Sequence, residues 1–97
     1  MNIETLQTAL ADLFAPWVQA LNLQADSFSS DSVVLRLPQN EQLSRLGGML
    51  SGQAMLAAAD TAMVLALINH FGEFRPCTTV QLSTSFLKPL SGQDALI

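Results

Sequence analysis

One aspartate, Asp60, lies in the middle of an apolar run, GQAMLAAADTAMVLALINHF, that extends over residues 52–71. Between Leu46 and Gly72 no other side chain is sure to be charged at pH 7, so Asp60 has no ion-pair partner within its own segment. Burying an unpaired carboxylate is costly, and carboxylates retained in apolar surroundings are often functional. Asp60 is therefore the first candidate catalytic residue, as a general base or a nucleophile.

The same run predicts a donor group for negative charge. Alanine, methionine and leucine favour a helix, which we expect to begin at Ser51 or Gly52, with Ser51 as a candidate N-cap, and to end at Gly72. The Gly52 N–H is one of the unpaired donors of the first helical turn, and the helix dipole favours an oxyanion there. Hydrolysis of a thioester needs such a donor together with a carboxylate.

The spacing of these two residues predicts an oligomer. Eight residues at a rise of 1.5 Å place Asp60 about 12 Å along the helix from Gly52, too far for both to reach one carbonyl group. If two such helices lie antiparallel across a two-fold axis, Gly52 of one chain can face Asp60 of the other. Each dimer would then carry two equivalent sites.

The remaining elements must position this helix. Residues 3–14 have apolar side chains at helical spacing, and Pro16 ends or kinks that helix. Apolar and polar side chains alternate over residues 32–38 and 77–89, which predicts a strand in each, and residues 95–97 look like the opening of a third strand. We therefore predict an α+β fold.

Composition limits the class of protein. The chain has 97 residues, a hydrophobic content of 49 % and a net charge of −4, which predict one domain over residues 1–97 and no nucleic-acid partner. Cys77 is the only cysteine, and the N-terminus lacks the pattern of a secretory signal, so we expect a cytoplasmic protein. The 52–71 helix is long enough to span a membrane, but Asp60 near its centre argues against that placement.

The segment GGMLSGQAMLAAADTA, followed by TVQLSTSFLKP, resembles the hotdog-fold acyl-CoA thioesterases, in particular the phenylacetic-acid-pathway type. The resemblance runs from about Ser32 to the end of the chain. It implies a long central helix wrapped by a curved antiparallel sheet, an acyl-CoA substrate, no cofactor and no metal, and a homodimer or homotetramer. It places Gly52 and Asp60 in the active site and Thr79 as an assisting hydroxyl, with Thr78 one register away.

The chain also departs from the family pattern. It has Ser51-Gly52-Gln53 where many relatives have His-Gly-Gly, and Arg45 where an asparagine is common. Ser51, Gln53 and Arg45 are therefore the candidate substrate-binding residues. A hydratase or dehydratase is less favoured, because that chemistry usually relies on a histidine near the helix start.

Other interpretations remain for single residues and for the whole chain. Met63 is predicted to fill the core rather than to flank an acyl group, and Cys77 to be a packing residue. The alternative to a thioesterase is a non-catalytic hotdog module that binds acyl groups or acyl-CoA. A third class is a structural or membrane-associated subunit. Because a wrapped helix needs more than two or three strands, we expect C-terminal strands to be missing from these 97 residues.

Overall fold

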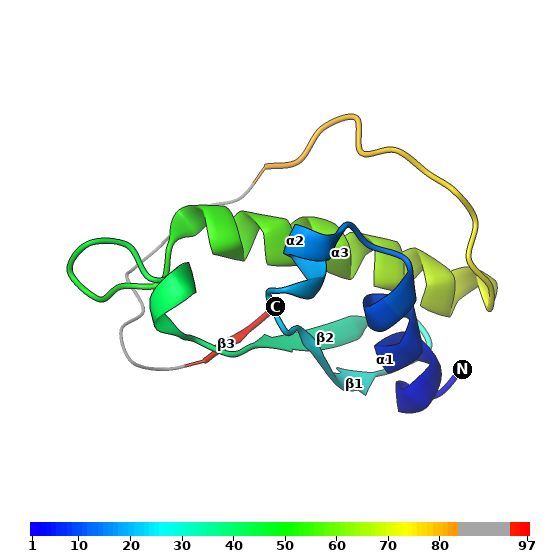
Figure 1. Ribbon diagram of the computed structural model, residues 1–97. Coiled ribbons are helices and arrows are strands. Elements are labelled where there is room, and N and C mark those ends of the chain that lie inside the picture. Colours follow the sequence, from blue (N-terminus) through cyan, green and yellow to red (C-terminus); the bar gives the residue numbers. More distant parts are fainter. Residues whose placement is uncertain (84–93) are drawn as a thin grey trace.

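A long helix packed on a small antiparallel sheet organises the molecule (Figure 1). The computed structural model describes residues 1–83 and 94–97. The sheet has the strand order β1-β2-β3, and α3 lies along one of its faces. The predicted α+β arrangement is therefore present. In chain order the elements are α1 (Ile3–Asp12), α2 (Pro16–Gln19), β1 (Gln24–Phe28), β2 (Val33–Leu37), the short 3-10 helix η1 (Glu41–Leu43), α3 (Gly52–Phe71) and β3 (Ala95–Leu96).

Both ends of α3 are fixed by the residues that the sequence indicates. The Ser51 side chain accepts a hydrogen bond of 3.2 Å from the Ala54 N–H, as an N-cap does. At the other end Gly72 adopts a left-handed conformation with φ of 76°, and its N–H donates to the Ile68 carbonyl at 2.8 Å. The predicted bounds of the helix are confirmed.

The core lies between α3, the sheet and α1. Leucines from three elements are fully buried there: Leu6, Leu35, Leu37 and Leu65. The residues on the inward face of α3 are spaced three or four positions apart, as residues on one side of a helix are. It consists of Ala54, Ala58, Thr61, Leu65 and Ile68. By length and composition α3 could also cross a membrane, but here this face packs against β2.

Strand β1 was not predicted from the sequence. The side-chain amide of Gln7 lies against its edge, where Nε2 donates to the Leu23 carbonyl at 3.2 Å and Oε1 accepts from the Ala25 N–H at 2.9 Å. The amide thereby satisfies the two backbone groups that a further strand would pair. With β2 on its other edge, β1 forms despite its almost fully exposed side chains.

The strand predicted over residues 77–89 is wrong in its described part. Residues 73–83 contain no strand and arch over the side of α3 that faces away from the sheet (Figure 1). A segment with alternating apolar and polar side chains forms a strand only where a neighbouring strand completes its backbone hydrogen bonds. Among the described residues no strand pairs with this segment. Residues 84–89 of the prediction lie outside the described residues. The third strand is confirmed, since β3 pairs with β2.

Candidate active site

Asp60 is brought together with Thr79 on the outer side of α3. Leu56, Asp60, Met63 and Leu67 follow one another at spacings of four, three and four residues, so they form one stripe on the helix. This outer stripe lies opposite the inward face. Asp60 is half-buried within it, and the Thr79 hydroxyl donates to its Oδ1 at 2.6 Å. The contact joins two of the three predicted catalytic residues and selects Thr79 over Thr78 as the hydroxyl that reaches the carboxylate.

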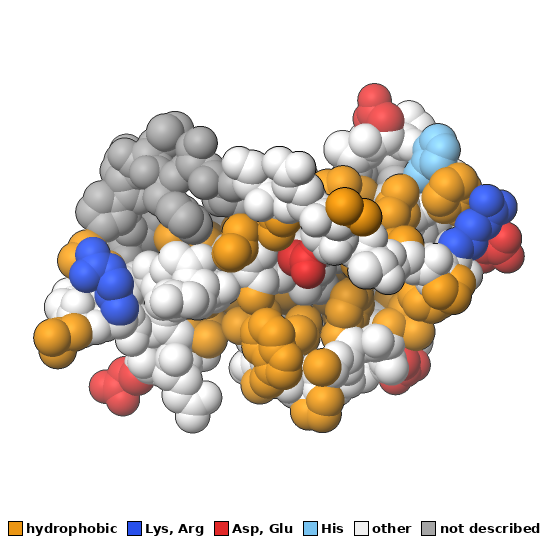
Figure 2. Space-filling model, turned by 90° about the horizontal axis from the view of Figure 1, so that it is seen from above, with side chains coloured by type: hydrophobic (Ala, Val, Ile, Leu, Met, Phe, Trp, Pro, Cys, Tyr) orange, Lys and Arg blue, Asp and Glu red, His pale blue; other side chains and the backbone are white. Residues whose placement is uncertain are grey.

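An apolar cavity of about 480 Å³ opens beside this carboxylate. One wall is α3 and the other is the segment of residues 77–83. Figure 2 shows hydrophobic side chains gathered on this face of the molecule. Asp60 is the one charged side chain among the described lining residues, and the described part of the chain holds no cluster of three His, Cys, Asp or Glu side chains suited to a metal ion. The lining residues are Asp60, Met63, Val64, Leu67, Cys77, Thr78, Thr79, Val80, Gln81, Leu82 and Ser83.

The N-terminus of α3 presents two adjacent free donors. The Ser51 N–H donates to the Leu43 carbonyl, and the Ala54 N–H is capped by the Ser51 side chain. Within residues 1–83 and 94–97, no group accepts a hydrogen bond from the N–H of Gly52 or Gln53. Two neighbouring N–H groups at a helix start can stabilise a developing oxyanion.

Gly52 and Asp60 do not meet within one chain. Both lie in one continuous helix, α3, so the separation of about 12 Å expected from the helical rise applies. A carbonyl group at Asp60 is therefore out of reach of the Gly52 N–H of the same chain. Within one chain the Asp60 carboxylate and the N–H groups of Gly52 and Gln53 are therefore two separate sites.

The three predicted substrate-binding residues lie near the start of α3 rather than near Asp60. The Ser51 hydroxyl is engaged as the helix cap, and Gln53 lines a hollow of about 280 Å³ together with Trp17. Arg45 is exposed on the loop before the helix, where its guanidinium contacts the Met49 sulfur at 3.2 Å. These residues could serve a substrate bound at the oxyanion donors of their own chain.

Two expectations about apolar residues are wrong. Met63, expected in the core, is 53 % exposed and lines the cavity beside Asp60, and Cys77 is an exposed thiol on the opposite wall. Leu67 lines the same cavity and was not singled out from the sequence. The available signal was the spacing of Asp60, Met63 and Leu67, which places all three on one side of a helix.

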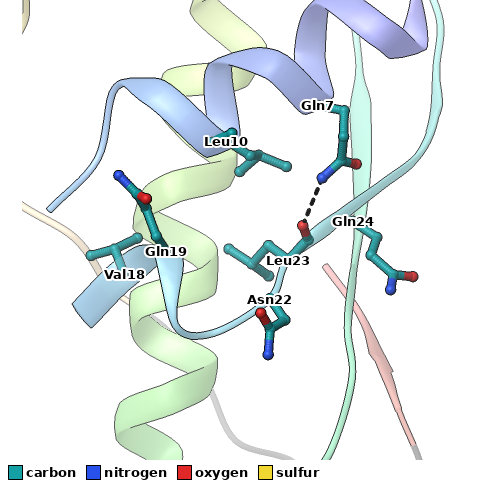
Figure 3. A pocket seen from close by; sticks show the side chains of 8 residues that line it. Gln7, Leu10, Val18, Gln19, Asn22, Leu23 and Gln24 are labelled. Carbon is teal, nitrogen blue, oxygen red and sulfur yellow. Dashed lines mark hydrogen bonds between the residues drawn. The ribbon is translucent and has the colours of Figure 1, made fainter. Parts of the chain in front are cut away.

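A second cavity, of about 370 Å³, lies between α1, α2 and the start of β1 (Figure 3). Amide side chains dominate its polar lining, and the amide of Gln7 is already engaged by the Leu23 carbonyl. The described residues around it include no carboxylate and no hydroxyl or thiol group. We therefore do not place the reaction there.

Comparisons with known proteins agree with this architecture. The solved structure of a conserved protein from Pseudomonas aeruginosa matches with a TM-score of 0.76 and 20% sequence identity, over 87% of this chain and 67% of that chain. None of the curated protein sequences matches significantly. Residues 47–97, which include α3 and Thr79, match the family described as the thioesterase superfamily. The fold is thus the hotdog fold, and the chain belongs to the thioesterase superfamily.

Proposed function

We propose that this chain hydrolyses an acyl-CoA thioester to a free acid and a thiol, as an enzyme of the phenylacetic-acid-pathway type. The observation that carries the proposal is the Asp60 carboxylate, which receives the Thr79 hydroxyl at 2.6 Å at the wall of an apolar cavity. Membership of the thioesterase superfamily supports the same reaction class.

The proposed reaction uses the two oxygens of Asp60 differently. Oδ1 is engaged by Thr79, which leaves Oδ2 to take a proton from water or to attack the carbonyl carbon. In the first case the water oxygen bonds to the carbonyl carbon, the carbon–sulfur bond breaks, and the thiolate leaves and takes up the proton. In the second case Oδ2 bonds to the carbonyl carbon, the carbon–sulfur bond breaks and the thiolate leaves; water then hydrolyses the resulting anhydride, which restores the Asp60 carboxylate, releases the acid and supplies the proton that the thiolate takes up. Either way the carbonyl oxygen becomes negatively charged and needs donors.

The N–H groups of Gly52 and Gln53 are the proposed donors, supplied by a second copy of the chain. The separation of Gly52 from Asp60 along α3 supports a homodimer, or a homotetramer built from two dimers, as the active form. Arg45 and Gln53 of the chain that supplies the donors would then contact the thiol portion of the substrate.

The test is a panel of acyl-CoA esters assayed by release of free thiol, with the wild type beside Asp60→Asn. We expect the substitution to lower kcat by about 10²–10⁴-fold, the range typical of a lost general base, and to leave substrate affinity nearly unchanged. Asp12→Asn is the matched control, because it removes an exposed carboxylate from another helix. Near-normal turnover in Asp60→Asn would refute the assignment.

The same measurements separate the enzyme from the non-catalytic acyl-binding module. A binding module would take up acyl-CoA with equal affinity in the wild type and in Asp60→Asn, and neither protein would release thiol. That result would exclude the proposed reaction.

A further inference from the structure

A loop with an exposed leucine at its tip precedes α3. Residues 44–50, here called the loop finger, fold back on themselves, and Ser44 pairs with Leu50 at the base. Gly47 turns the chain at the tip with φ of 98°, a conformation that tight turns reserve for glycine. Leu46 beside it is 97 % exposed. A leucine that folding leaves almost wholly in water gains free energy from any contact that covers it.

Hydrogen bonds hold the loop finger in one position. The Arg45 N–H donates to the Met49 carbonyl at 2.8 Å, which joins the two arms. The Gln39 side-chain amide donates to the Ser44 hydroxyl and to the Gly48 carbonyl, both at 3.2 Å. Figure 1 shows this loop projecting past the first turn of α3, away from the body of the helix. A loop already ordered in this way loses little further entropy when it contacts a partner.

The proposed dimer determines which residues the loop finger meets. If Gly52 of one copy faces Asp60 of the other, the two-fold axis passes beside residue 56, midway between them. Leu56 lies in the outer stripe and is 39 % exposed, so the axis falls on an apolar surface. Met63 and Leu67 of the second copy lie about 4.5 and 10.5 Å beyond its Asp60 along the helix axis.

The loop finger is long enough to reach that stretch. Its tip lies two or three residues from the Ser44–Leu50 pair, which corresponds to about 7–10 Å of extended backbone. Directed past the helix start, Leu46 of one copy comes level with Met63 and Leu67 of the other. These two side chains are 53 % and 37 % exposed and line the cavity beside Asp60. Both surfaces are therefore apolar and uncovered in a single copy.

The charges near this contact are complementary. Among the described residues Arg36 and Arg75 form ion pairs with carboxylates, whereas Arg45 forms none. The Asp60 carboxylate also has no ion pair within the described part of its own chain. In the dimer the loop finger carries Arg45 toward Asp60 of the second copy, and such opposite charges favour this docking over other arrangements.

We propose that Leu46 of each copy packs between Met63 and Leu67 of the other copy and so completes the cavity beside Asp60 from across the dimer. The proposal deepens the proposed function and rests on it, because the register follows from the shared site. It adds to that site a residue that lies almost wholly in water within its own chain.

Cysteine cross-linking tests the contact directly. Leu46→Cys and Leu67→Cys are made in separate full chains, each with Cys77→Ser so that the introduced thiol is the only one. Two cysteines form a disulfide only when their Cα atoms lie within about 7 Å of each other. We expect a disulfide-linked dimer on a non-reducing gel when the two proteins are mixed and oxidised, and none from either protein alone. Met63→Cys in place of Leu67→Cys samples the other side of the contact.

A second measurement gives the weight of the contact. Leu46→Gln removes one apolar contact at each of two equivalent positions, so the Kd of the dimer in analytical ultracentrifugation should rise about tenfold for each, or about 100-fold. Leu13→Gln is the matched control, because it replaces another exposed leucine at the C-cap of α1 and should leave Kd unchanged. Leu56→Cys tests the helix pairing itself and should cross-link to its own copy across the two-fold axis.

The outcomes separate the contact from the proposed function. A covalent dimer through Leu56→Cys, with none between Leu46→Cys and either partner cysteine, would overturn the contact and leave the shared site standing. Equal effects of Leu46→Gln and Leu13→Gln on Kd would also overturn it. A wild type that stays monomeric would overturn both the contact and the shared site. Cross-links at both positions, with no thiol released from any acyl-CoA, would keep the contact and refute the enzyme.

Discussion

The hydrogen bond from Thr79 to Asp60 allows the sharpest prediction about catalysis. Its O···O distance of 2.6 Å lies in the range of short, charge-assisted hydrogen bonds. Hydrogen bonds to charged groups contribute about 1.5–3 kcal/mol, and because Thr79 is exposed we take the lower end of that range. A loss of about 1.5 kcal/mol in the transition state corresponds to about a tenfold lower rate.

Thr79→Val removes the hydroxyl and keeps the shape of the side chain. We expect kcat/KM for acyl-CoA, measured by release of free thiol, to fall about tenfold in this variant. Thr79→Ser should retain most of the activity, because its hydroxyl can still reach Oδ1. Thr78→Val is a control on the neighbouring residue, which lines the cavity but makes no recorded bond to Asp60 in the described structure.

A double-mutant cycle tests the physical reason for this effect. If Thr79 acts by orienting the Asp60 carboxylate, then Thr79→Val should change kcat/KM very little when it is added to Asp60→Asn. An unchanged rate in the single Thr79→Val variant would refute the reasoning. So would a tenfold loss that persists in the Asp60→Asn background, because Thr79 would then act independently of the carboxylate.

Three further predictions concern the donor site and the scaffold. Gly52→Pro removes the proposed oxyanion donor at a helix position that accepts proline, so this variant should be inactive while Gly52→Ala stays active. Mixing Gly52→Pro chains with inactive Asp60→Ala chains should restore the release of thiol. If mixed oligomers are shown to form and no activity returns, the site is not shared between chains. Gln7→Ala leaves the Leu23 carbonyl and the Ala25 N–H without their side-chain partner, so calorimetry should show a Tm lower by about 4–8 °C for each kcal/mol lost from the free energy of unfolding. Gln24→Ala is the control and should unfold at the Tm of the wild type. Ser51→Ala removes the helix cap and should cost about 1 kcal/mol in urea unfolding; a loss of equal size in Ser51→Asp would argue against capping as the cause.

The long helix was predictable because its signals are local. Ser51 offers a side-chain oxygen at the start of the run and Gly72 offers a left-handed conformation at its end, so both bounds follow from single residues. The face that would pack on the sheet was not predictable. Leucine and methionine occur on the outer side at Leu56 and Met63, while alanine and threonine occur on the inner side, so polarity does not distinguish the two.

The elements that depend on distant partners were missed or placed wrongly. Strand β1 has little alternation of its own and forms between β2 and the amide of Gln7, which lies in α1. The segment of residues 77–83 has the alternating apolar and polar residues of a strand but lies against the outer side of α3 instead. Its Thr79 donates a hydrogen bond to the carboxylate of Asp60, 19 residues earlier in the chain. Such contacts depend on the folded arrangement, so no window of sequence contains them.

The continuity of α3 from Gly52 to Phe71 constrains how the site can be completed. A helix cannot bring its first residue to a point eight residues further along, so no movement of loops within one chain unites the Gly52 N–H with Asp60. Ser51 is extended, with φ of −69° and ψ of 145°, so the loop ends sharply where the helix begins and the free donors point away from the helix body. The outer stripe that carries Asp60 is apolar and exposed at Leu56, which lies between the two groups, and at Met63 and Leu67, which lie beyond Asp60. An antiparallel second copy of α3 is the simplest arrangement that would bring each carboxylate to the other chain's donors, and it would cover part of this apolar surface at the same time.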